Sequence, residues 1–71
     1  MANWKVKRMT IENGEQYGND WVALCELVDK DTGTGDFFPV PFTLGEVTAD
    51  PTYILDTLTG EGYTPNDWGG V

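Results

Sequence analysis

With 71 residues, the chain has room for one small domain, and its single cysteine, Cys25, cannot form an internal disulfide. The sequence contains no histidine, which excludes a Cys/His zinc site and any triad or acid–base pair built on histidine. Twelve acidic residues against four basic ones give a formal net charge of −8, and every Lys and Arg precedes residue 31. The C-terminal half is therefore not expected to bind nucleic acid directly, because its carboxylates would repel phosphate groups.

The first predicted element is a strand near the N-terminus. Trp4 and Val6 alternate with lysines, so they share one face of that strand. Met9 and Ile11 fall on the opposite parity. A β-bulge near Arg8 would return both to the core face, since one extra residue reverses the alternation.

The second element is ambiguous between a helix and a strand. Trp21, Leu24, Cys25 and Val28 have helical spacing, but they also suit a strand that is buried on both faces. We favour the strand, because the segment is short and a cluster of Asp, Thr and Gly follows it, as in a hairpin.

The third element is predicted to be an edge strand. Apolar residues alternate from Phe38 to Leu44, and Pro39 and Pro41 occupy the positions between them. Positions two apart direct their N–H groups to the same side of a strand, so both prolines would leave one side without donors. Such an edge blocks the addition of a further strand.

A short helix should follow. Asp50 is the expected N-cap, Pro51 the first helical residue and Gly60 the C-terminal cap. Ile54 and Leu58 belong to its apolar stripe. The polar, glycine-rich residues that follow are expected to form an irregular tail.

Together these elements predict an α+β fold: a small three-stranded antiparallel sheet with one short helix on a face and an irregular C-terminal tail. The whole chain, 1–71, forms one acidic domain. The predicted elements are strands at about 3–12, 20–29 and 36–44, and a helix at about 51–59.

The segment 29–36 raises the question of a metal site. Asp29, Asp31 and Asp36 offer hard oxygen ligands, and the spacing resembles the opening of an EF-hand loop. The resemblance fails where Gly33 replaces a third ligand and where Val40 stands in place of the bidentate Glu. We expect a hairpin turn here, with weak calcium binding as an alternative function.

Enzymatic chemistry is not expected. Cys25 lies in an apolar stretch without a histidine partner, which is typical of a core thiol. The carboxylates are spread singly, and a chain of this size leaves little room for a pocket. We therefore predict no catalytic residues, no cofactor and no metal.

The chain is predicted to be cytoplasmic. No apolar run reaches the length of a membrane span, and no apolar segment of a secretory signal follows the basic N-terminus. For a phage-encoded protein, this location means the host cytoplasm or the virion.

The predicted function is that of a non-enzymatic protein-interaction module with an acidic surface, such as a phage or mobile-element accessory protein or a minor assembly subunit. Its partner would be a protein with a basic patch, or a second copy of itself. The alternative is a DNA-mimic inhibitor that occupies the basic site of a nucleic-acid-binding protein. Trp68 is either an exposed anchor or part of the core. The residues expected at the interaction surface are Asp31, Asp36, Glu46, Asp50, Asp56, Glu61, Asp67 and Trp68.

Overall fold

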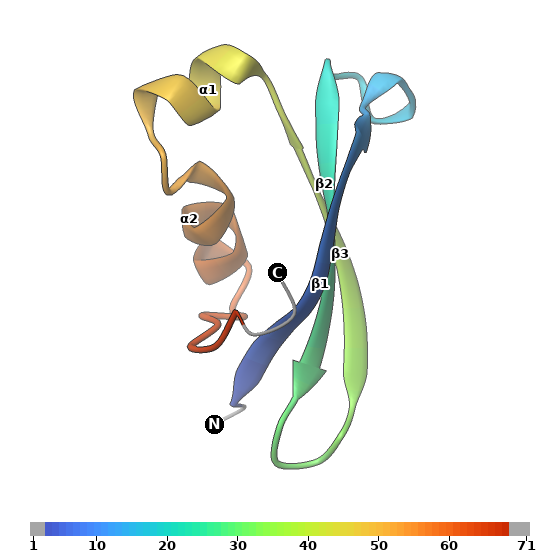
Figure 1. Ribbon diagram of the computed structural model, residues 1–71, viewed down its shortest axis with the longest axis vertical. Helices are drawn as coiled ribbons and strands as arrows, with labels where there is room; N and C mark the ends of the chain where they lie inside the picture. Colours follow the sequence, from blue (N-terminus) through green and yellow to red (C-terminus); the bar gives the residue numbers. More distant parts are fainter. Residues whose placement is uncertain (1–2, 69–71) are drawn as a thin grey trace.

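The protein is a three-stranded antiparallel sheet with two short helices on one face (Figure 1). The computed structural model describes residues 3–68. The strands are adjacent in the order β1-β2-β3, so each pairs with its neighbour in the sequence. This arrangement confirms the predicted α+β fold. The elements are β1 (Trp4–Asn13), the 3-10 helix η1 (Glu15–Tyr17), β2 (Trp21–Asp29), β3 (Gly35–Phe42), α1 (Leu44–Ala49) and α2 (Tyr53–Gly60).

The predicted bulge is present in β1. Val6 pairs with Leu27 and Arg8 with Glu26, which leaves Lys7 as the extra residue. Beyond the bulge, Met9 lies on the helix-facing side and packs against the core. The sequence pattern thus placed the bulge correctly, because only an added residue reconciles the two parities.

The ambiguous second segment is a strand, and it is the middle strand of the sheet. Its odd-numbered residues Ala23, Cys25 and Leu27 are buried among the core side chains beneath the helices. The segment Asp29–Gly35 then reverses the chain into β3, as the hairpin prediction required.

The helical layer differs from the prediction in its number of helices and in its caps. An unpredicted helix, α1, begins after Thr43, which forms a reciprocal capping box with Glu46. Asp50 ends α1, so it is not the N-cap of α2; that position belongs to Thr52. The predicted C-cap at Gly60 is also wrong, because α2 includes it.

Gly62, two residues after the end of α2, has a backbone conformation with positive φ, at 96°, which glycine adopts readily. Its N–H donates to the carbonyl of Thr59, and the N–H of Tyr63 donates to the carbonyl of Leu58. These bonds satisfy carbonyls that the end of a helix leaves without partners.

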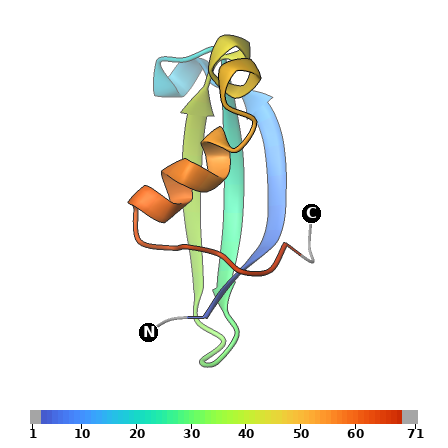
Figure 2. The ribbon, with the colours of Figure 1, turned by 90° about the vertical axis from the view of Figure 1, so that its left-hand side faces the viewer.

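The C-terminal tail returns to the beginning of β1 and crosses it (Figure 2). The N–H of Val6 donates to the carbonyl of Asp67 at 2.8 Å, and the N–H of Asn66 donates to the carbonyl of Trp4 at 3.2 Å. Trp68 is half-buried and packs against the core, so it is not an exposed anchor.

Tyr63 is the aromatic residue that joins the start of the tail to the sheet. Its ring meets that of Trp4 edge to face, with centroids 5.1 Å apart, and it also contacts the ring of Phe38. Such pairs add about 0.5–1.5 kcal/mol beyond the burial of their area.

The core lies between the sheet and α2, which runs obliquely across β2 and β3 (Figure 2). None of the helices within residues 3–68 has the length and apolar character of a membrane span. The fully buried residues of this core are Val6, Ala23, Cys25, Leu27, Val40 and Leu58.

Leu58 carries the contact of α2 with the sheet. We expect Leu58→Ala to lower the free energy of unfolding by about 2–5 kcal/mol, because it removes a fully buried side chain and leaves a cavity. Leu44→Ala is the matched control: Leu44 is 62% exposed, and its truncation should change stability by about 0.5 kcal/mol or less. Chemical denaturation measures both, and equal losses would contradict the position of the core.

Candidate functional site

The acidic loop of the β2–β3 hairpin is held by its own backbone donors. The N–H of Asp31 donates to the Asp29 carboxylate at 3.0 Å, and that contact lowers the pKa of Asp29. The N–H of Gly33 donates to the Asp29 carbonyl at 2.7 Å, with Gly33 at φ 77°. Between residues 3 and 68, no group of three or more potential metal ligands lies close together. These contacts are those of a hairpin turn.

Asp36 is bound to the C-terminal part of the chain. Its carboxylate accepts the hydroxyl of Tyr63 and, at 2.8 Å, the N–H of Phe37. The two donors, Tyr63 first, lower the pKa of Asp36. The same hydrogen bond raises the pKa of Tyr63 to about 12, because the phenolate would face a carboxylate.

The acids of the helical layer also bind within the chain. Glu46 accepts the N–H of Thr43 at 2.9 Å, and the hydroxyl of Tyr53 is the largest cause of its lowered pKa. The hydroxyl of Thr52 lies 2.8 Å from the Asp50 carboxylate. The same hydroxyl lies 3.1 Å from Asp56 Oδ2 and lowers the pKa of Asp50.

The predicted interaction residues therefore do not converge on one site. Asp31 is exposed in the hairpin, Glu61 is exposed after α2, and Asp67 lies in the tail 3.5 Å from Lys30 Nζ. The remaining acids lie in β3 and the helical layer and hold local structure. Sequence reasoning detected their charge but not these local roles.

Cys25 occupies the position predicted for a core thiol. It is fully buried in β2, and burial raises its pKa to about 11. Its Sγ lies 3.7 Å from the carbonyl of Ala23. A thiol with so high a pKa is almost entirely protonated near neutral pH.

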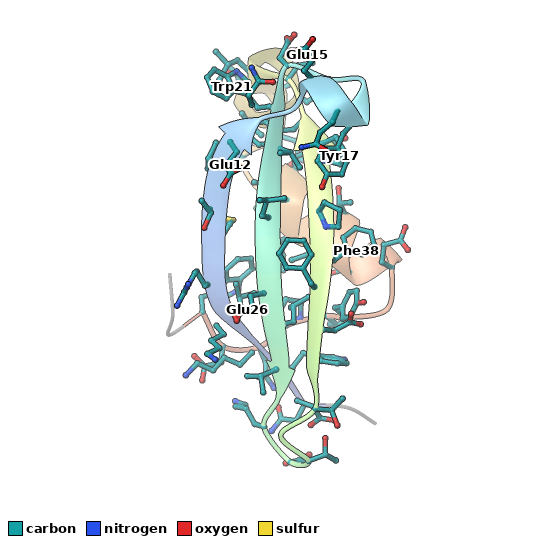
Figure 3. The ribbon with its side chains drawn as sticks, turned by 90° about the vertical axis from the view of Figure 1, so that its right-hand side faces the viewer. Glu12, Glu15, Tyr17, Trp21, Glu26 and Phe38 are labelled. Carbon is teal, nitrogen blue, oxygen red and sulfur yellow. The ribbon has the colours of Figure 1, made fainter. Side chains whose placement is uncertain are left out.

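The surface that sequence reasoning missed is the sheet face opposite the helices, which we call the open face (Figure 3). The strand pairing places apolar side chains of β2 and β3 next to one another there, since Val22 pairs with Pro41 and Leu24 with Pro39. Phe37 pairs with Glu26 in the same row and is 53% exposed. The apolar residues of the open face are Val22, Leu24, Val28, Phe37, Pro39 and Pro41.

One end of the open face is partly covered. The helix η1 folds over this side of the sheet, and its Tyr17 lies near the end of β3 (Figures 1 and 3). Val22 is buried at this end, whereas Leu24, Val28 and both prolines are only half-buried. Away from this end, no helix of the described residues covers the apolar residues of β2 and β3 on the open face, and Phe37 is the most exposed of them.

A basic border runs along the β1 side of the open face. Lys5 pairs with Val28, and Arg8 with Glu26, so both lie beside the apolar row. Lys7 Nζ lies 3.8 Å from Glu26 Oε2, across the bulge. Three of the chain's four basic residues therefore lie along the same margin.

A signal for the open face exists in the sequence. The even-numbered residues of β2 are apolar at 22, 24 and 28, and this pattern suggested a strand buried on both faces. In the structure, α1 and α2 cover only one of those faces, and η1 reaches only one end of the other (Figure 1).

Comparison of the chain with protein-family models, curated proteins and solved structures finds no match, so its geometry alone supports a function.

The Tyr63–Asp36 hydrogen bond predicts a pH-dependent loss of stability in Tyr63→Phe. The Asp36 pKa is lowered from 3.8, so this contribution is present above that pH and is lost as pH falls through the lowered pKa. The Tyr63 pKa is raised from 10.0, so the contribution is present below pH 10.0 and is lost as pH rises through about 12.

We therefore expect wild type to exceed Tyr63→Phe in stability between these limits, with the difference shrinking on both sides. Thermal melts across the pH range measure it. Tyr17→Phe is the control, because Tyr17 is exposed and its hydroxyl makes no hydrogen bond within residues 3–68. A difference that does not vary with pH would contradict the assigned bond.

Proposed function

We propose that this protein is a non-enzymatic protein-interaction module that binds its partner through the open face. The observation that supports this is the row of apolar side chains along β2 and β3, in which Phe37 is 53% exposed. Exposed apolar patches bordered by polar residues are typical of protein-binding sites on small domains.

Phe37 is the expected centre of the binding energy. Covering its exposed half would remove on the order of 100 Å² of apolar surface from water, which corresponds to ~2–3 kcal/mol. The neighbouring Pro39 and Pro41 have rigid rings and lose little conformational entropy when a partner covers them. An aromatic residue among such neighbours is the usual composition of a binding hot spot.

The charge distribution gives the partner an orientation. Lys5, Lys7 and Arg8 border the open face, while residues 31–71 contain no basic residue. On the acidic surface alone, the expected partner is a protein with a basic patch. Binding through the open face instead favours a partner with acidic groups beside its own apolar patch, which the basic border would attract and the acidic helical side would repel. Complementary charges of this kind set orientation and association rate more than affinity.

Such a module suits a small accessory protein or a minor subunit of a larger assembly. The DNA-mimic alternative has less support, because the acids are dispersed over the hairpin, helices and tail. The calcium alternative has less support because donors of the chain bind Asp29 and Asp36.

Phe37→Glu tests this function. The tagged wild-type protein is used to isolate a partner from extracts of the source cells, and the purified pair is measured by calorimetry. We expect Phe37→Glu to weaken binding by at least about tenfold, because a buried carboxylate replaces an apolar contact.

Leu44→Glu is the matched control, since Leu44 is also an exposed apolar residue, somewhat more exposed than Phe37, but lies at the start of α1, in the helical layer. It should bind within about twofold of wild type. Equal binding by Phe37→Glu and wild type, with unchanged melting curves, would show that the open face is not the binding surface.

A further inference from the structure

The two outer edges of the sheet differ in whether they can accept another strand. At β3, the prolines at 39 and 41 have no N–H, and their place in the ladder turns them outward. Phe37 has the same parity, and its N–H already donates to the Asp36 carboxylate at 2.8 Å. The outer edge of β3 therefore offers no free N–H between Phe37 and Pro41.

The beginning of β1 is closed as well, but by the tail. The carbonyl of Trp4 and the N–H of Val6 point outward and are bonded to Asn66 and Asp67. Within residues 3–68, no other backbone hydrogen bond reaches the outer edge of β1 beyond Val6.

Among residues 3–68, nothing pairs with the outer edge of the rest of β1. Arg8, Thr10 and Glu12 pair with even-numbered residues of β2, whose backbone groups face β1. The intervening residues Met9 and Ile11 therefore point their N–H and C=O groups away from the sheet. An unpaired strand edge is a template for another strand.

The side chains beside this edge are also incompletely covered. Ile11 lies on the helix-facing side and is 47% exposed, and Trp21, in the adjacent strand, is 40% exposed. The helices cross β2 and β3 but leave this part of β1 uncovered (Figure 2). A strand added here would gain both hydrogen bonds and apolar contact.

We infer that the added strand is β1 of a second copy, paired antiparallel about a twofold axis at Thr10. In this register Met9 pairs with the partner's Ile11, and their outward N–H and C=O groups form two hydrogen bonds. The twofold axis repeats this pair, which makes four hydrogen bonds in all. Arg8 then lies opposite the partner's Glu12, and the twofold repeats this ion pair. Both ion pairs lie on the open face, because Arg8 pairs with Glu26 of that face and Glu12 is seen on it (Figure 3).

Two features favour this register over those shifted by one residue: the Arg8–Glu12 ion pairs and the length of the available edge of β1. Moving the axis to Ile11 would place Arg8 opposite the partner's Gly14 and lose both ion pairs. Moving it to Met9 would bring the partner onto the bulge and toward Val6, which the tail already covers. Thr10 is the midpoint of the stretch from Arg8 to Glu12, so an axis at Thr10 uses this edge and leaves the bonds of residues 66 and 67 to Trp4 and Val6 in place.

This contact would join the three strands of each copy into one continuous sheet, with the two open faces on the same side. It uses the edge of β1, whereas the proposed function uses the apolar row of β2 and β3. The two hypotheses can therefore fail separately, and Phe37→Glu should leave the dimer intact.

Thr10→Cys tests the twofold axis directly. Thr10 would face itself in a non-hydrogen-bonded pair, where Cα atoms lie about 4.5 Å apart, within the range that a disulfide can span. We expect mild oxidation to yield a covalent dimer in non-reducing gels. The native Cys25 should not interfere, because it is buried and its thiol is protonated.

Thr48→Cys and Thr59→Cys are the matched controls, since both threonines are exposed on the helices, away from the edge. They should show little covalent dimer under the same conditions. Equal cross-linking of all three variants, or none in Thr10→Cys, would overturn the inference.

A charge exchange tests the register in the reduced protein. Arg8→Glu and Glu12→Arg should each weaken the dimer by about tenfold in sedimentation equilibrium, because each places like charges opposite one another twice. The double variant Arg8→Glu/Glu12→Arg should recover wild-type dimerisation. A monomeric wild type at millimolar concentration, or a double variant weaker than either single one, would rule out this register.

Discussion

The dominant constraint on this protein is that a sheet has two faces and the chain supplies α-helices for only one of them. The core forms where α2 packs on the sheet through Leu58, and the tail completes it near Trp4. The opposite face carries apolar residues of β2 and β3, with η1 over one end. A domain of this size buries only about 60% of its unfolded surface and is marginally stable. The apolar area that it leaves exposed on the second face must therefore stay small.

Electrostatics follow the same division. Asp36 holds the tail through Tyr63, Glu46 caps α1, and Asp50 accepts from Thr52 where α1 ends. These acids stabilise the helical side locally, because the part of the chain beyond Lys30 contains no basic residue to pair with them. The basic border is left for the open face, so the charged groups distinguish the two sides of the sheet as clearly as the helices do.

Local chemistry made most of the fold predictable, and long-range packing explains what was missed. The bulge before Arg8 follows from the parity of the apolar residues in β1. The closed edge at Pro39 follows from its missing N–H. Both signals lie within a single strand. The capping box at Thr43 is also a local pattern. The prediction missed it because the sequence Asp50-Pro51 is itself typical of a helix start. The open face depends on how much chain remains to cover it, and the alternation within β2 cannot reveal that.

The tail across the start of β1 has a consequence for how the chain is made. Trp4 and Val6 emerge from the ribosome before Asn66 and Asp67, so the bonds between them form only after the tail has emerged. Until then, the N–H of Val6 and the carbonyl of Trp4 lack these partners, although the residues of the β2–β3 hairpin have already been synthesised. Contacts of such large sequence separation are slow to form, because the intervening loop must be ordered first. Neighbouring nascent chains on one messenger could therefore engage the same amides before the tail does.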